Sequence, residues 1–211
     1  MNQPVAVTAE TLRRAAAILR SGGVVAFPTE TYYGLAVDPL SRLALERLLQ
    51  VKQRPRTLPI LALVADLGQL RLLVNEIPEV YEQLIDCFWP GPLTLAFPAQ
   101  PAVPPQLTGD TGTVGLRQSP HATANQLIAA FGGPITATSA NKSGFLAAVT
   151  AGEVAQIFGT AVDLILDGGT TPGGSGSTIV GISGASLYCF REGKIPFSAV
   201  QQCAAAHDLK Y

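Results

Sequence analysis

The sequence predicts an α/β protein that folds as one domain. Its 211 residues are 47% hydrophobic, which is enough to bury one substantial core within the usual size of a single domain. Short, continuously apolar runs, typical of buried strands, alternate with segments in which apolar residues recur every three or four positions, as in amphipathic helices. This alternation is typical of sheets covered by helices.

The chain opens with a helix and a strand that lead into a polar segment. Thr8 can cap a helix whose apolar residues share one face, and a glycine pair at 22–23 can stop that helix. Residues 24–27 then form a buried strand, which Pro28 ends, and polar side chains crowd residues 29–33. Ligands of open α/β sheets bind beyond the C-terminal strand ends, so residues 29–33 are the first candidate for a site.

Helices and strands continue to alternate through the rest of the chain. Helices are expected at residues 41–52, 66–74, 78–88, 121–131 and 150–158, where Thr150 and Glu153 form a capping box. Strands are expected at residues 58–64, 93–97, 113–117, 134–138, 164–167, 177–182 and 187–191. Residues 99–112 and 168–176 are expected to be loops, and the short tail from Phe197 a marginal helix.

Charge and cysteine content exclude several classes of protein. A net charge of −1 with only 14% charged residues is too balanced for a broad nucleic-acid or membrane surface, so any such contact must be local. Cys87, Cys189, Cys203, His121 and His207 show no disulfide or zinc spacing, and we expect reduced thiols. The sequence shows neither a signal core nor an apolar run of membrane length, so we expect a cytoplasmic protein.

Cations are scarce enough to be informative. Arg117 and Arg191 each follow an apolar run, and an arginine at a strand end can bind a carboxylate or phosphate with two hydrogen bonds, although it can also be a solvated rim residue. Lys52 and Arg54 end a predicted helix one residue apart. They suit a phosphate-bearing ligand, or are ordinary solvated charges at the negative helix end. Glu30 is the only acid in a candidate site stretch, so catalysis would depend on positioning and charge neutralisation.

Residues 139–144 and 168–176 each allow two interpretations. In an extended segment, Ser139 and Asn141 point the same way and can donate hydrogen bonds to a ligand; the alternative is a polar turn that satisfies its own backbone. Ser139 and Lys142 also match a serine-nucleophile motif, but the following Ser-Gly predicts a turn instead of the required helix. Residues 168–176 fit neither known phosphate loop and are expected to form a mobile loop or hairpin, or else a lid or backbone-amide cradle.

The segments PTETYYGL, KQRP, FWPGPLTL, VGLR, TSANKSG, ILDGG and GSTIVG, in this order, resemble the YrdC-like family of L-threonylcarbamoyladenylate synthases. The resemblance covers about residues 8–194 and implies a twisted, mixed open sheet with flanking helices and a central cavity. It also implies a nucleotidyltransferase that joins L-threonine, bicarbonate and ATP into threonylcarbamoyl-AMP and releases pyrophosphate. A separate threonylcarbamoyl transferase complex would then modify tRNA.

The family's functional residues can be carried over by position. The resemblance places threonine contacts at Thr29, Arg117 and Ser177, with Arg117 on the substrate carboxylate. It places ATP contacts at Lys52, Arg54, Thr113, Ser139, Asn141, Thr150 and Arg191, of which Lys52, Arg54, Ser139 and Asn141 are the expected catalytic group. Leu63 stands where many members carry a histidine. The chain resembles the short form of the family, without the second domain of longer members.

Magnesium and RNA are the remaining expectations. Three phosphates need more charge compensation than two or three side chains supply, but no acidic ligand set is visible, so we expect the nucleotide to hold Mg²⁺. A non-catalytic RNA-binding module of the same fold is the alternative function, and the near-neutral composition argues against it. A weak RNA contact stays open.

Overall fold

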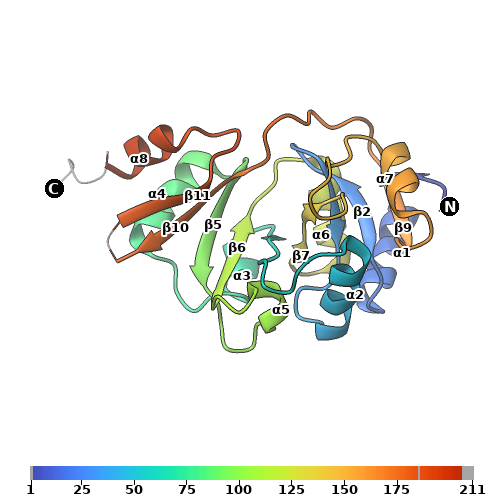
Figure 1. Ribbon diagram of the computed structural model, residues 1–211, viewed down its shortest axis with the longest axis horizontal. Helices are drawn as coiled ribbons and strands as arrows, with labels where there is room; N and C mark the ends of the chain where they lie inside the picture. Colours follow the sequence, from blue (N-terminus) through green and yellow to red (C-terminus); the bar gives the residue numbers. More distant parts are fainter. Residues whose placement is uncertain (1, 185, 206–211) are drawn as a thin grey trace.

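The computed structural model describes residues 2–184 and 186–205 and has a mixed α/β fold (Figure 1). The helices are α1 (Ala9–Arg20), α2 (Arg42–Lys52), α3 (Leu67–Leu70), α4 (Glu79–Phe88), α5 (Pro105–Thr108), α6 (Ala122–Phe131), α7 (Ala151–Phe158) and α8 (Phe197–Ala205). The strands are β1 (Val5–Ala6), β2 (Val25–Pro28), β3 (Tyr33–Ala36), β4 (Ala62–Leu63), β5 (Leu93–Pro98), β6 (Thr113–Arg117), β7 (Ile135–Thr136), β8 (Thr138–Ser139), β9 (Leu164–Asp167), β10 (Thr178–Ser183) and β11 (Ser186–Arg191). The predicted fold class is confirmed.

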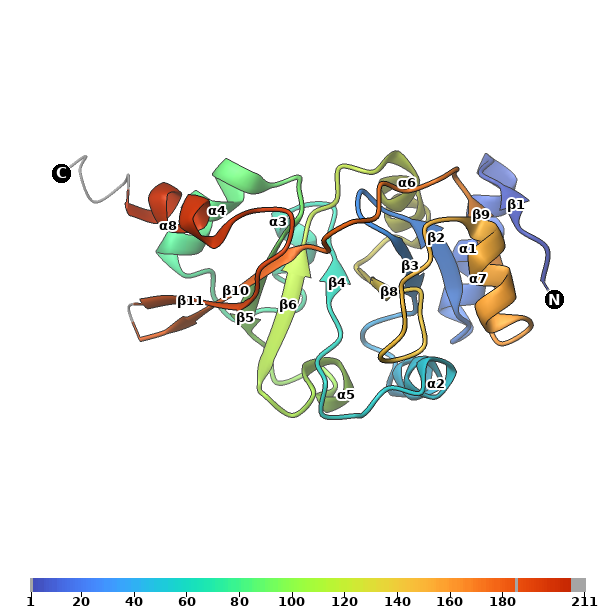
Figure 2. The same ribbon diagram turned by 45° about the horizontal axis from the view of Figure 1, so that its top comes forward.

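The strands form two mixed sheets, where one was expected. The first has the order β1-β9-β2-β3-β8 and the second the order β11-β10-β5-β6-β4-β7. In Figure 1 the first lies on the right with α1, α6 and α7, and the second on the left with α4 and α8. The predicted strand at 134–138 divides between the sheets, because β7 pairs with β4, whereas β8 pairs with β3 (β3 and β8 in Figure 2). The two sheets are therefore linked through this short segment.

Strand β2 is buried on both faces, which explains its continuous apolar run. Val24 and Ala26 belong to a core packed with residues of α2 and α7, whereas Val25 and Phe27 belong to a second core beneath α1 and α6. Successive side chains of a strand point to opposite faces, so an unbroken apolar run fits a strand with helices on both sides. The polar residues after β2 are thereby held at the end of a rigid element.

Several boundaries differ from the prediction. Strand β3 was missed: Pro28 does not end the sheet but pairs with Tyr33 across a tight hairpin, where it is the last residue of β2. The predicted strand at 58–64 is reduced to β4, the helix at 66–74 to α3, and the loop at 99–112 contains α5. In each case tertiary contacts, which composition does not show, decide how far regular structure extends.

The helix caps are as predicted. Thr8 accepts a hydrogen bond from the Thr11 amide at the start of α1, and Thr150 forms a capping box with Glu153 at the start of α7. Such caps satisfy amide groups that the first helical turn leaves unpaired, and each stabilises its helix by about 1 kcal/mol. They fix where α1 and α7 begin.

The prediction of reduced thiols is wrong for two of the three cysteines. Cys87 in α4 and Cys203 in α8 form a disulfide, while Cys189 is free. Helices α4 and α8 lie side by side in both ribbon views, an arrangement that a sequence separation of 116 residues does not reveal.

His207 and the rest of residues 206–211 lie outside the described residues. Among the helices that the structure describes, none has the length and apolarity needed to cross a membrane.

Candidate functional site

A pocket of about 790 Å³ lies between the two sheets and brings together most of the predicted site residues. The predicted residues that line it are Thr29, Arg54, Thr113, Arg117, Ser139, Ser177 and Arg191. They come from the β2–β3 hairpin and β8 on one side and from β6, β11 and the residue before β10 on the other, while Arg54 comes from the segment after α2. Lys52, Asn141 and Thr150 do not line this pocket. A central cavity, as expected from the sequence, stays a prediction.

Hydroxyl groups on both walls are held by hydrogen bonds. On the hairpin, Thr29 Oγ1 donates to the Tyr32 carbonyl at 2.8 Å and lies 3.0 Å from Thr31 Oγ1. Across the pocket, Thr94 Oγ1 donates to Ser177 Oγ at 2.9 Å. The sequence interpretation missed Thr94, although a polar residue between two leucines of a buried strand was a usable signal. Both walls thus offer hydroxyls in fixed positions.

Three arginines make the pocket positive. Arg117 is only 2% exposed, and burial, followed by the charge of Arg191, lowers its pKa to about 10. The pKa of Arg54 is also lowered by burial and then by Arg191, and burial lowers the pKa of Arg191 itself. All three stay charged near neutral pH. Within residues 2–184 and 186–205, only Arg117 of these three has an acidic partner, Glu30, so the pocket suits an anion.

Lys52 and Arg54 have different environments although they are one residue apart. Gln53 adopts the left-handed conformation, with φ of 51°, and ends α2 between them. Lys52 is 1% exposed and its Nζ donates to the Ser139 carbonyl, to the Asn141 carbonyl at 2.8 Å and to Asn141 Oδ1 at 3.2 Å. Burial, and then Arg54, lowers its pKa to about 7. Arg54 faces the pocket, whereas Lys52 fixes the segment that carries Ser139.

Asn141 and Thr150 make their hydrogen bonds within the protein. Asn141 Oδ1 accepts from Ser139 Oγ at 2.6 Å, and its Nδ2 donates to the Phe145 carbonyl at 2.6 Å. The Thr150 hydroxyl caps α7. The expectation that Ser139 and Asn141 both point to a ligand fits only Ser139, because residues 139–141 turn and the Asn141 amide stabilises the turn.

The glycine-rich segment at 168–176 connects the two sheets and follows the upper edge of the molecule from β9 to β10 in Figure 1. It is bonded to the hairpin, since the Gly173 amide donates to the Thr31 carbonyl at 2.8 Å and Tyr32 Oη donates to the Gly174 carbonyl. A Cβ on Gly193 would lie 2.2 Å from the Gly176 carbonyl oxygen, so this approach requires glycine. The segment thus links the two walls of the pocket.

Apolar side chains at the pocket were missed in the sequence. Phe145 and Leu146 are 73% and 92% exposed and line the pocket together with Tyr188 and Phe190 of β11. Exposed apolar residues at a pocket are typical of ligand or partner surfaces. The only signal was the pair of large apolar residues that directly follows the polar residues 141–144.

No metal-binding cluster is visible in the described part of the chain: His, Cys, Asp and Glu side chains do not gather in groups of three. The residues present therefore do not fit a metal held by the protein, and we derive no step from one.

The fold and the pocket define a mixed α/β protein whose arginine-lined pocket between two sheets suits a small anionic ligand. The family model described as "Telomere recombination", that of the Sua5/YciO/YrdC proteins, matches residues 17–193. The chain belongs to this family.

The chain matches different shares of its curated relatives. The chain is 39% identical over 191 residues to a threonylcarbamoyl-AMP synthase of Pyrococcus abyssi, covering 90% of this chain and 56% of that protein. It is 40% identical over 164 residues to a threonylcarbamoyl-AMP synthase of Vibrio cholerae, covering 77% of this chain and 87% of the relative. The chain thus spans little more than half of the P. abyssi relative.

Solved structures share the fold. The structure of P. abyssi Sua5 complexed with L-threonine superposes with a TM-score of 0.91 at 37% identity, over 96% of this chain and 60% of that one. Escherichia coli YciO superposes with a TM-score of 0.82 at 24% identity, over 93% of this chain and 98% of the other, which shows the fold alone.

Proposed function

We propose that this protein is a nucleotidyltransferase that joins L-threonine, bicarbonate and ATP into threonylcarbamoyl-AMP and releases pyrophosphate. The observation that carries the proposal is Arg117, a buried guanidinium at the pocket wall whose Nε has no hydrogen-bond partner. A buried charged donor without a partner is costly, so the site is built for an incoming acceptor. The name shared by the curated relatives supports threonine, whose carboxylate is such an acceptor.

In this proposal the two substrates contact different sets of pocket residues. The threonine carboxylate lies at Arg117, with Thr29 and Ser177 as neighbouring hydrogen-bonding groups. The phosphates lie against Arg54, Arg191 and the hydroxyls of Thr113 and Ser139, where the cations compensate negative charge. Lys52 acts on the nucleotide through the turn at Ser139, and Mg²⁺ arrives with the nucleotide.

The reaction makes one carbon–nitrogen bond and one new bond to phosphorus. The threonine nitrogen bonds to the carbon of bicarbonate with loss of water, which gives a carbamate. A carbamate oxygen then bonds to the α-phosphorus of ATP, and the bond from that phosphorus to the bridging oxygen of pyrophosphate breaks. The pocket assists by holding both substrates together and by neutralising the phosphates, and no acid–base pair is required.

Two other functions fit the site less well. Ser139 Oγ donates to Asn141 Oδ1, and Lys52 Nζ contacts the Ser139 carbonyl instead of this oxygen, so a serine nucleophile would lack its base. RNA binding without chemistry does not explain a buried arginine such as Arg117.

We propose that the product passes to a separate transferase complex that modifies tRNA. We place this reaction in the cytoplasm, with at most a weak direct contact between this protein and RNA. We also propose that residues 8–194 act as one domain.

The test measures pyrophosphate release by the purified protein with ATP, L-threonine and bicarbonate. We expect release that requires both threonine and bicarbonate and that survives moderate salt, unlike binding through many RNA phosphates. Arg117→Lys should weaken threonine use by about tenfold or more, because lysine lacks the planar fork. Arg47→Lys is the matched control, since Arg47 pairs with Asp163 away from the pocket. Folded protein that releases no pyrophosphate would overturn the proposal.

A further inference from the structure

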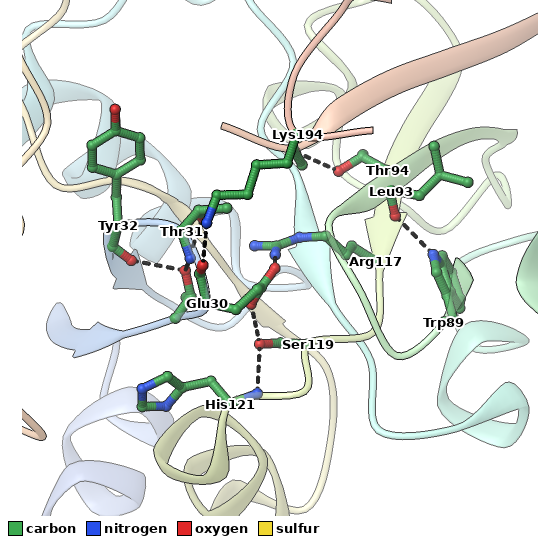
Figure 3. Close-up of polar contacts among 12 residues, drawn as sticks. Glu30, Thr31, Tyr32, Trp89, Leu93, Thr94, Arg117, Ser119, His121 and Lys194 are labelled. Carbon is green, nitrogen blue, oxygen red and sulfur yellow. Dashed lines mark hydrogen bonds and ion pairs between the residues drawn. The ribbon is translucent and has the colours of Figure 1, made fainter. Parts of the chain in front are cut away.

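Glu30 does not line the pocket and contacts parts of the chain that are far apart in sequence (Figure 3). Its Oε1 forms an ion pair with Nη1 of Arg117, and its Oε2 accepts a hydrogen bond from Ser119 Oγ at 2.5 Å. Its backbone carbonyl accepts from Lys194 Nζ at 2.8 Å. The hairpin, the segment after β6 and the segment after β11 therefore meet at this one residue.

Ser119 is in turn held in place. It is fully buried, and its Oγ accepts a hydrogen bond from the His121 amide at 3.2 Å, just before α6. With one hydrogen accepted from the backbone and one donated to Glu30, the hydroxyl has a defined orientation. The Glu30 carboxylate is thus fixed from the side opposite to Arg117.

Arg117 needs such a restraint. Its backbone is fixed in the second sheet, where Arg117 pairs with Leu63 and its carbonyl accepts from the Val64 amide at 3.1 Å. Its long side chain makes no hydrogen bond to any residue that the structure describes, and Nε has no partner. Glu30 is the only carboxylate in ion-pair contact with it there. A flexible arginine loses conformational entropy when it binds a ligand, and a fixed partner removes part of that cost in advance.

We propose that Glu30 is the positioning residue for Arg117, holding the guanidinium at the pocket wall in the orientation that the threonine carboxylate requires. This inference rests on the proposed function. Glu30 does not line the pocket, so it acts through Arg117 and not on the substrate. Because its side chain is only 14% exposed, the ion pair persists when threonine binds, and the ligand meets the remaining N–H groups of Arg117.

Glu30 could instead weaken threonine binding, and this alternative predicts a measurably different result. A carboxylate next to Arg117 repels a second carboxylate, so a Glu30 that merely competed with the ligand would weaken threonine binding. Removing its charge would then tighten binding. Positioning and competition therefore predict changes of opposite sign.

The experiment measures threonine and ATP dissociation constants by calorimetry for wild type, Glu30→Ala, Glu30→Gln and Ser119→Ala. Glu30→Ala should weaken threonine binding by about tenfold or more and change ATP binding by less than about twofold, since only the carboxylate contact is misplaced. Glu30→Gln keeps the shape and an acceptor for Arg117, and should recover part of the loss. Ser119→Ala lies outside the pocket and should weaken threonine binding by less than Glu30→Ala does.

Controls separate the possible failures. Glu46→Gln, which removes an acid paired with Arg56 outside the pocket, should bind both ligands as wild type does. Threonine binding by the Glu30 variants that equals or exceeds that of wild type would overturn the inference, as would an equal loss for ATP in folded variants. Arg117→Lys tests the underlying function: if it also binds threonine normally, the placement of the substrate at Arg117 is wrong, and the inference fails with it.

Discussion

Replacing Lys52 by methionine is the substitution that best separates a structural role of this lysine from a direct electrostatic role toward the nucleotide. Methionine keeps the unbranched side chain but removes the amine that donates to three acceptors of residues 139 and 141. At a net value of about 1 kcal/mol for each hydrogen bond, the loss is at most about 3 kcal/mol. The easier burial of a thioether than of an amine offsets part of it. We therefore expect a loss of about 2 kcal/mol in the free energy of unfolding.

The loosened turn should also weaken ATP binding, since Ser139 would no longer be held at the pocket. We expect an ATP dissociation constant raised by about tenfold, or about 1.4 kcal/mol, with threonine binding nearly unchanged. Urea unfolding and calorimetric titration measure the two effects. Lys142→Met is the matched control, because Lys142 lies next to the same turn and has no ion-pair partner within the described residues. Equal ATP affinities in Lys52→Met and Lys142→Met would refute the reasoning.

Three further predictions concern stability and the turn that carries Ser139. The pKa of Lys52 lies at about 7 in the folded protein and at its ordinary 10.5 in the unfolded chain, so between these values the unfolded chain binds more protons and stability rises with pH. The stability of wild type relative to Lys52→Met should therefore increase from pH 7 to pH 9 in urea titrations at both values, and a constant difference would contradict the pKa. Asn141→Ala should reduce pyrophosphate release more than Ser139→Ala, because the Asn141 amide makes hydrogen bonds with three residues whereas Ser139 gives up a single hydroxyl contact. Reducing the Cys87–Cys203 disulfide, which joins residues 116 apart, should lower the free energy of unfolding by about 2 to 5 kcal/mol, as Cys203→Ser should without reductant; unchanged thermal midpoints would speak against the disulfide.

Site residues were predicted best from the sequence where a buried strand ends in a polar residue. Strand β6 was predicted with its correct bounds, and Arg117 at its end lines the pocket as a buried cation. Thr29 comes directly after β2 in the same way. In both cases the local pattern, an apolar run closed by a polar side chain, determines position, because burial of the run fixes the place of the next residue.

The directions in which side chains point could not be predicted from the sequence. Whether Lys52 faces the pocket or backbone carbonyls depends on how residues 139–143 approach the end of α2, which is a tertiary contact. The ion pair of Arg117 with Glu30 joins residues 87 positions apart, and the disulfide depends on the packing of α4 against α8. None of these pairings has a local signature, since each partner also has an ordinary solvated alternative.

The most direct test of the proposed activity traces the carbon atom of bicarbonate. The purified protein is incubated with ATP, L-threonine and ¹³C-bicarbonate, and the nucleotide product is analysed by mass spectrometry. We predict an AMP adduct that contains threonine and one additional labelled carbon, formed together with pyrophosphate and strongly reduced in Arg117→Lys. An adduct of threonine and AMP without the label, or no adduct from folded protein, would contradict threonylcarbamoyl-AMP synthesis by this chain.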